Sequence, residues 1–269
     1  MKVIDMHTHI FPEKIAAKAT VATAEYFDLP EPPNHYGSVS ELVDVLRRAG
    51  INYAMVFSAA TTEHQVEHIN RYICSEAEVN SHFLPCGTIH AGYEHYREEL
   101  GWMREHGIHG VKLHPEFQHF VLNDERLFPM FEEMEKNDMF LIAHMGDPRV
   151  NVSGPRRMIP IAETFPKLRC IAAHLGNWGD WDIEKIRPLA KLPNVYTDIS
   201  SSFSYVTDKA PLYSILREYD PTHVFWGSDY PIWCPQKELD KTLALGLEQD
   251  FLEDVLFNNF AAFYHYRKL

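Results

Sequence analysis

Lys2-Val3-Ile4-Asp5-Met6-His7-Thr8-His9-Ile10 is the stretch that decides the fold, because it predicts a buried strand whose end carries polar side chains. Side chains alternate along an extended chain, so we expect Asp5, His7 and His9 to share one face. The two imidazoles would lie about 6.6 Å apart along the strand, which lets both reach one metal ion. In a chain with 16 histidines in 269 residues, one His-x-His is expected about once by chance. The motif therefore needs further ligands from other strands.

The rest of the chain alternates apolar stretches with amphipathic ones. We expect strands at 51–57, 83–89, 108–113, 139–143, 168–173, 194–199 and 223–226. Helices are expected at 40–48, 62–79, 93–106, 126–137, 155–164, 181–192, 209–219, 236–245 and 248–266. Residues 11–37 read as an insertion after the first strand, with a helix at 15–27 and a turn rich in proline at Pro30, Pro32 and Pro33.

Near-continuously apolar strands that alternate with helices indicate a parallel sheet covered by helices. Counted from Val3, the pattern predicts an α/β fold, a (β/α)8 TIM barrel, as a single domain over residues 1–269. The competing fold is an open doubly wound sheet. That fold usually carries a glycine-rich phosphate loop after its first strand, where this chain has His7 and His9.

Composition restricts the partners. A formal net charge of −13 disfavours nucleic acid and anionic membranes, so we expect a small-molecule substrate. The chain has neither a long apolar run nor a basic-then-apolar leader, from which we expect a cytoplasmic protein. The four cysteines form no CxxC pair and are too few for a disulfide framework in a chain of this length.

The predicted strands end in polar residues far more often than packing requires. These residues are His7 and His9 on the first strand, then His114, His144, His174, Asp198 and Asp229 after strands four to eight. In a barrel, catalytic groups come from these ends. One divalent ion with three imidazoles, a carboxylate and an open position for water would suit them. Zinc is the default ion, and manganese, iron or cobalt could occupy the same set.

The opening Ile4-Asp5-Met6-His7-Thr8-His9, the histidines that end strands five and six, and Gly227-Ser228-Asp229-Tyr230-Pro231 carry a family resemblance. Together they resemble the amidohydrolase superfamily, specifically its amidohydrolase-2 branch of metal-dependent TIM-barrel hydrolases and non-oxidative decarboxylases. The resemblance implies the metal ligands His7, His9, His144 and Asp229. It also implies that His174 lies beside the metal, that Asp229 and His174 are catalytic, and that the protein can form a homodimer.

Other polar and aromatic residues at the barrel mouth are candidates for substrate binding: Lys112, His114, Arg149, Trp178 and Trp233. Arg149 would suit a carboxylate, and aromatic loop residues such as Trp178, Phe203 and Tyr205 would suit a flat molecule. Lys112 has two further interpretations. It can form an ion pair with Asp198 or Asp229, or, as the resemblance implies for members with two metals, be carboxylated and bridge the ions.

The favoured reaction is hydrolysis of a small ester, lactone or amide by a metal-activated water, with Asp229 taking the proton and His174 assisting the oxyanion. The main alternative is non-oxidative decarboxylation of an aromatic or dienoic carboxylic acid at the same metal site. A phosphoesterase and a catalytically silent binding barrel are weaker alternatives.

Overall fold

The computed structural model describes residues 1–29, 31–203, 206 and 208–269. Pro30 and Tyr205 therefore lie outside the described residues. The strands are β1 (Ile4–His9), β2 (Tyr53–Phe57), β3 (Phe83–Pro85), β4 (Gly87–Thr88), β5 (Gly110–Leu113), β6 (Phe140–Ala143), β7 (Arg169–Ala172), β8 (Val195–Asp198) and β9 (Val224–Phe225).

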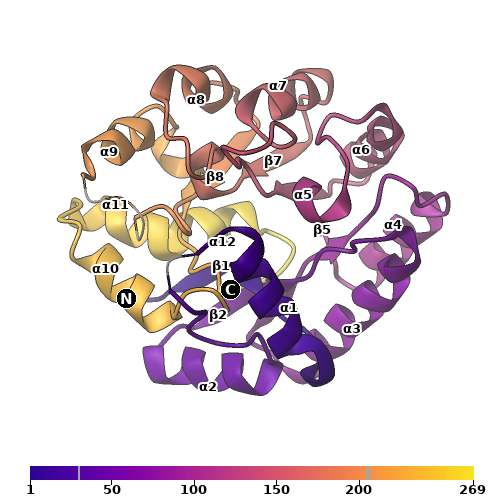
Figure 1. Cartoon of the computed structure of the whole chain (residues 1–269), viewed down its shortest axis with the longest axis horizontal. Coiled ribbons are helices and arrows are strands. Elements are labelled where there is room, and N and C mark those ends of the chain that lie inside the picture. Colours follow the sequence, from indigo (N-terminus) through magenta and orange to yellow (C-terminus); the bar gives the residue numbers. More distant parts are fainter. Residues whose placement is uncertain (30, 204–205, 207) are drawn as a thin grey trace.

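Helices surround these strands (Figure 1). They are α1 (Glu13–Tyr26), α2 (Val39–Ala49), α3 (Val66–Val79), α4 (Tyr96–Glu105), α5 (Pro115–Gln118), α6 (Phe128–Lys136), α7 (Pro155–Thr164), α8 (Ile183–Ala190), α9 (Ala210–Leu216), α10 (Pro235–Leu243), α11 (Gln249–Glu253) and α12 (Asn259–Phe263). None of the helices in these described ranges is long and apolar enough to cross a bilayer.

All strands pair in parallel, in the ladders β1-β2-β3 and β4-β5-β6-β7-β8-β9. The strand expected at 83–89 is split at Cys86, whose backbone N–H donates to the carbonyl of Val56 at 3.0 Å. Its first half pairs with β2 and its second half with β5. The segment after β9 returns to β1, where Met6 N–H donates to the carbonyl of Trp226 at 3.1 Å. The predicted α/β TIM barrel is confirmed.

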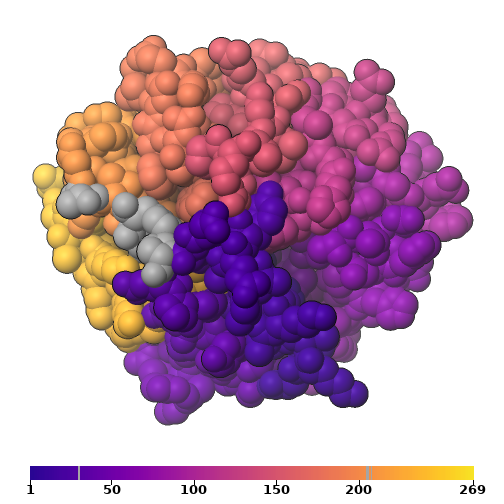
Figure 2. Space-filling model, in the orientation of Figure 1, coloured from indigo at the N-terminus to yellow at the C-terminus, as the bar shows by residue number. Residues whose placement is uncertain are grey.

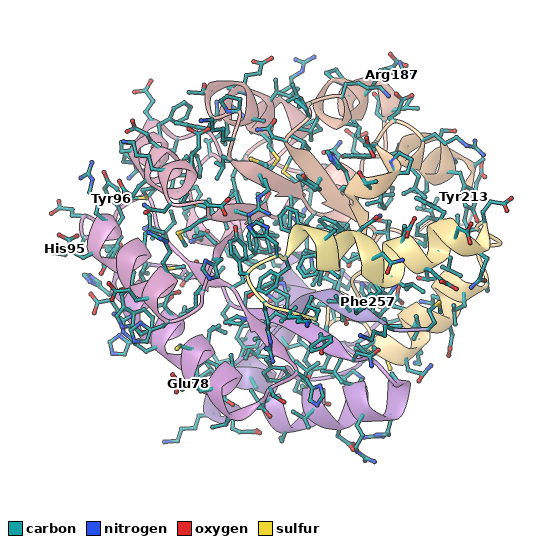
Figure 3. The ribbon with its side chains drawn as sticks, turned by 180° about the vertical axis from the view of Figure 1, so that it is seen from behind. Glu78, His95, Tyr96, Arg187, Tyr213 and Phe257 are labelled. Atoms are coloured by element: carbon teal, nitrogen blue, oxygen red, sulfur yellow. The ribbon has the colours of Figure 1, made fainter. Side chains whose placement is uncertain are left out.

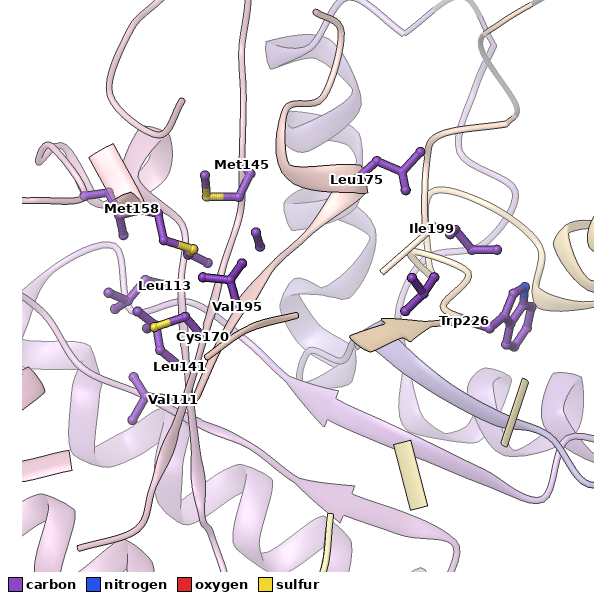
Figure 4. Packing of buried hydrophobic residues seen from close by; sticks show 14 of the residues in the cluster. Val111, Leu113, Leu141, Met145, Met158, Cys170, Leu175, Val195, Ile199 and Trp226 are labelled. Atoms are coloured by element: carbon purple, nitrogen blue, oxygen red, sulfur yellow. The ribbon is translucent and has the colours of Figure 1, made fainter. Parts of the chain in front are cut away.

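The strands contribute to two buried clusters, because their side chains point alternately inward and outward. Outward residues such as Val111, Leu113 and Leu141 pack under the helices with Cys170 and Val195 (Figure 4). Inward residues fill the barrel together with aromatic residues of α12 and its C-terminal end, and include Ile4, Met55, Phe140, Ile171, Phe225, Phe260, Phe263 and Tyr264. Seen from behind, the C-terminal helical segment that carries Phe257 lies across the barrel end (Figure 3).

One predicted feature of β1 is wrong. Asp5 pairs with Ala54 and His9 pairs with Phe57, and the register shifts between Asp5 and Thr8. Ala54 belongs to the outer core and Phe57 to the inner core, so Asp5 and His9 lie on opposite faces. The bulge inserts one extra residue into β1, which breaks the alternation that the sequence predicts.

The insertion after β1 forms α1 and its following loop, which lie across the mouth of the barrel (Figures 1 and 2). The buried residues of α1 are the small Ala16, Thr20 and Ala24. Thr20 Oγ1 donates to the carbonyl of Tyr36 at 2.7 Å, which ties the helix to the end of the same insertion. The helix therefore covers the barrel mouth without entering the main core.

Candidate metal centre and cavity

The motif Gly227-Ser228-Asp229-Tyr230 is built directly onto β1. A side-chain carbon at Gly227 would lie 2.6 Å from Cβ of His7, so only glycine allows this approach. Asp229 N–H donates to the carbonyl of His7 at 3.0 Å, and His9 N–H donates to the carbonyl of Tyr230 at 2.8 Å. These backbone bonds bring the carboxylate of Asp229 to the two histidines.

Asp229 converges with the first-strand histidines through its side chain. Its Oδ1 lies 3.5 Å from Nε2 of His7 and 3.6 Å from Nε2 of His9. Although burial opposes ionisation, the neighbouring His9 and His7 hold the pKa of Asp229 well below its usual range. Asp229 also has a left-handed backbone, with φ of 61°, a conformation that non-glycine residues adopt mainly where the surroundings enforce it.

His7 is oriented by a buried carboxylate. Its Nδ1 lies 3.0 Å from Oδ2 of Asp198, and both side chains are fully buried. Burial lowers the pKa of His7 to about 3, so the ring is neutral. A proton on Nδ1 then pairs with Asp198 and leaves the lone pair of Nε2 facing Asp229. This carboxylate–histidine arrangement is the one that metal-binding histidines usually show.

The donors of this group fit a divalent ion. Ligand atoms at about 2.0–2.2 Å from one ion lie about 3–3.5 Å from each other, close to the separations between Asp229 and the two histidines. His7, Asp229 and also His174 offer ligand atoms that all lie within 4.8 Å of one another. We call His7, His9, Asp229 and His174 the first donor group.

His174 is fixed by β8 and the residues after it. Its Nδ1 lies 3.1 Å from the carbonyl of Ser200 and 2.9 Å from Ser200 Oγ. Because the carbonyl can only accept, the tautomer with its proton on Nδ1 fits this contact and leaves Nε2 unprotonated. Like Asp229, His174 has a left-handed backbone, with φ of 59°.

His144 lies beside His174, and among the described residues no hydrogen bond or ring contact joins it to His7 or His9. Its Nδ1 is 3.1 Å from Nε2 of His174, and its Nε2 is 2.9 Å from the carbonyl of Gly146. In neutral tautomers these contacts leave two acceptor nitrogens facing each other, so a proton or a cation has to lie between the rings. The ligand role of His144 stays a prediction.

His114 and Glu116 form a second donor group with His144. The ligand atoms of these three buried residues lie within 4.8 Å of one another. The rings of His114 and His144 stack at 4.1 Å with an angle of 7° between them. Sequence reasoning did not identify Glu116. The signal available was its position two residues after the polar end of β5, in the motif His114-Pro115-Glu116.

Lys112 is buried inside the barrel and contacts the first donor group. Its Nζ lies 3.0 Å from Nε2 of His7. Burial lowers the pKa of Lys112 to about 8, although Asp198 and Asp229 oppose this shift. The amine therefore contacts Nε2 of His7, the same nitrogen that faces Asp229. The substrate, ion-pair and bridging roles of Lys112 stay predictions.

A cavity of about 420 Å³ lies between α1 and the barrel mouth. Its polar end is formed by residues of both donor groups: His9, His114, His144, His174 and Asp229. Its body is largely apolar and aromatic, and includes Phe11, Tyr26, Phe27, Phe117, Trp178 and Ile232. Phe27 contacts the rings of Trp178 and His144, with centroids 5.0 Å and 5.4 Å away.

The other predicted substrate-binding residues have different surroundings. Arg149 pairs with Asp147 at 2.8 Å, donates to the carbonyl of Tyr26 and stacks on the Tyr26 ring. It is not among the described lining residues and instead holds the end of α1. Trp233 is also absent from the described lining, and its Nε1 donates to Ser201 Oγ at 2.8 Å. Trp178 does line the cavity.

A parallel barrel with clustered imidazole and carboxylate donors at the C-terminal ends of its strands defines a TIM barrel with a candidate metal centre. Comparison with known families agrees. A family model described as "Amidohydrolase", Amidohydro_2, matches residues 4–266, and the chain belongs to this metal-dependent family. No curated protein sequence gives a significant match.

Solved structures share the fold at low sequence identity. A TIM-barrel protein, Bb4693 from Bordetella bronchiseptica, has a TM-score of 0.80 at 19% identity over 99% of each chain. The 5-carboxyvanillate decarboxylase LigW from Sphingomonas paucimobilis has a TM-score of 0.70 at 14% identity over 98% of this chain and 99% of its own. A dihydroxybenzoic acid decarboxylase from Polaromonas sp. JS666, with bound manganese and 2-nitroresorcinol, has a TM-score of 0.72 at 11% identity over 98% and 97%.

Proposed function

We propose that the protein is a metal-dependent decarboxylase that removes CO₂ without oxidation from a small aromatic or dienoic carboxylic acid. The observation that carries this proposal is the cavity. Its body of Phe27, Phe117 and Trp178 suits a flat apolar molecule, while its polar end presents histidines and Asp229. Helix α1 covers this space, which limits the access of water (Figure 2).

The sequence motifs favoured hydrolysis. The apolar body of the cavity suits decarboxylation better than hydrolysis. A carboxylate placed among aromatic rings loses hydration, and its conversion to neutral CO₂ relieves that loss. Among the described lining residues there is no lysine or arginine, so no cationic side chain stabilises the carboxylate against this loss. The decarboxylases with similar folds support the same reaction class.

His7, His9 and Asp229 would hold the divalent ion, with His174 beside it. When bound, the ion would supply positive charge that stabilises the electron pair left on carbon. Asp198 keeps the proton of His7 on Nδ1, and Ser200 keeps that of His174 on Nδ1. In the reaction Nε2 of His174 would first take up a proton from solvent; the carbon–carboxylate bond then breaks, CO₂ leaves, the electron pair stays on carbon, and His174 transfers that proton from Nε2 to the carbon.

The test uses protein loaded with Zn²⁺ or Mn²⁺ and a panel of aromatic and dienoic acids, each paired with the ester or lactone of the same skeleton. We expect CO₂ release from at least one acid and, in D₂O, one deuterium at the carbon that lost CO₂. His174→Gln should abolish this release, whereas the same change at the exposed His95 should not. Release of acid from esters or lactones, with no CO₂ from any acid, would overturn the proposal.

Hydrolysis remains the second candidate because of Asp229. Its carboxylate is ionised and opens on the cavity, where it could accept a proton from an attacking water. The same paired panel detects this activity directly.

A further inference from the structure

The carboxylate of Asp229 has a second oxygen that faces away from the histidines of the first strand. Oδ1 lies near Nε2 of His7 and of His9, whereas Oδ2 accepts a hydrogen bond from Ser201 Oγ. Ser201 has no role in the reaction proposed above, and the sequence did not suggest it as a site residue. Its contact with Asp229 therefore needs an explanation of its own.

The barrel brings Ser201 and Asp229 together from two neighbouring strands. β8 and β9 pair in parallel, with Asp198 opposite Phe225, and both side chains come from the loops that directly follow these strands. Both residues line the cavity, and both have a left-handed backbone, with φ of 51° and 61°. Non-glycine residues keep this conformation where the surroundings enforce it, so both ends of the hydrogen bond are held in place.

Trp233 fixes the direction of the hydrogen bonds. Its indole Nε1 donates to Ser201 Oγ at 2.8 Å. Because an indole N–H can only donate and an ionised carboxylate can only accept, Ser201 accepts from Trp233 and gives its own proton to Asp229. Hydrogen bonds that follow one another in this way polarise and strengthen each other. Trp233, which the sequence suggested as a substrate-binding residue, therefore contributes to the metal centre from behind Ser201.

This chain of hydrogen bonds determines which oxygen of Asp229 meets the histidines. The last torsion angle of an aspartate side chain is broad, so a carboxylate that nothing held could turn and exchange its two oxygens. The charge-assisted bond from Ser201 opposes that rotation. Outer partners of this kind commonly orient the side chains that bind a metal and raise its affinity.

We propose that Ser201 is a positioning residue for Asp229 and that Trp233 acts through Ser201. Ser201 holds Oδ2, so that Oδ1 is the oxygen presented to a divalent ion. Asp198 has the corresponding effect on His7, whose tautomer it fixes. The proposal rests on the metal centre assigned above and is independent of which reaction that centre catalyses.

Ser201→Gly is the sharpest test, because glycine removes the hydroxyl and adopts a φ of 51° without strain. A competition titration of the full-length protein with Zn²⁺ and a chelator of known affinity measures the effect. We expect Zn²⁺ binding to weaken about 10-fold, the lower end of the range for loss of an outer partner. Ser214→Ala is the control, because it removes a hydroxyl that donates to the carbonyl of Ala210 on α9, and it should keep the affinity.

A double-mutant cycle tests the part played by Trp233. Trp233→Phe alone should weaken Zn²⁺ binding less than Ser201→Gly does. In the Ser201→Gly background the same change should have no further effect, because the indole acts only through the hydroxyl. Losses that multiply in the double variant would overturn the path through Ser201.

The visible spectrum of the Co²⁺-loaded protein supplies a readout that a change in stability would not move. In Ser201→Gly the absorption bands should change, because a released carboxylate can bind the ion through either oxygen or both. A Zn²⁺ affinity within roughly threefold of the unaltered protein, or an unchanged Co²⁺ spectrum, would overturn the positioning role of Ser201. Neither measurement depends on CO₂ release, so failure here leaves the proposed decarboxylation untouched.

Discussion

Replacing Asp198 by Asn should weaken metal binding at the first donor group without a direct contact to the ion. Oδ2 of Asp198 accepts the proton on Nδ1 of His7 at 3.0 Å, while Oδ1 accepts from the backbone N–H groups of His174 and Ser200 at 3.3 and 3.0 Å. In the Asn variant, Oδ1 can keep its backbone donors. The new NH₂ group then faces His7 and donates to Nδ1, which forces the proton of the ring onto Nε2.

The expected magnitude follows from that change of tautomer. Removing a partner of a metal-bound histidine typically costs about 10–100-fold in affinity, or about 1.4–2.7 kcal/mol. Asp198→Asn also blocks the nitrogen that would bind the ion, so we expect the upper end of this range, about 100-fold.

The assay is a Zn²⁺ competition titration against a chelator of known affinity, with Asp44→Asn as the control. Asp44 is a partly exposed carboxylate that pairs with Arg47 and Arg48 on α2. An Asp198→Asn affinity within roughly threefold of the unaltered protein would refute the assigned tautomer of His7 and the role of Asp198 in orienting it.

Three further outcomes test other parts of the structure. Burial raises the pKa of Asp5 to about 7, above its unfolded value, so the ionisation of Asp5 should cost metal-free protein up to about 4 kcal/mol of unfolding free energy as pH rises from 4 to 7. In urea titrations, the unfolding free energy of Asp5→Asn should therefore rise relative to that of the unaltered protein over this pH range, and a difference that does not change with pH would contradict the raised pKa. Gly146→Ala would place Cβ 2.4 Å from the backbone nitrogen of Trp178 at φ of 89°, so the urea midpoint should fall by the equivalent of roughly 2–4 kcal/mol. Burial raises the pKa of the Cys86 and Cys170 thiols, which should react with a thiol reagent only after unfolding; reaction in the folded state would contradict their burial.

The sequence predicted the strands and helices well where local pattern suffices. The helix at 155–164 matches α7, and residues such as His114 and His144 directly follow the strands expected to precede them. Capping was less exact. The helix expected at 40–48 is capped two residues earlier, by Ser38, whose side chain accepts from Glu41 N–H at the start of α2. Periodicity and strand-end position are local properties, which is why a sequence can reveal them.

Tertiary structure decided how those residues group. Contacts between segments far apart in the chain, or strand register, decided four features: the bulge in β1, the contact of His144 with His174, the burial of Glu116 and the contact of Arg149 with Tyr26. Spacing along the chain cannot report such contacts, because strand register, turn geometry and side-chain packing set them only once the barrel forms. The sequence by itself determined that histidines and carboxylates meet at one end of a barrel. The folded chain decided that they meet as two groups beneath α1.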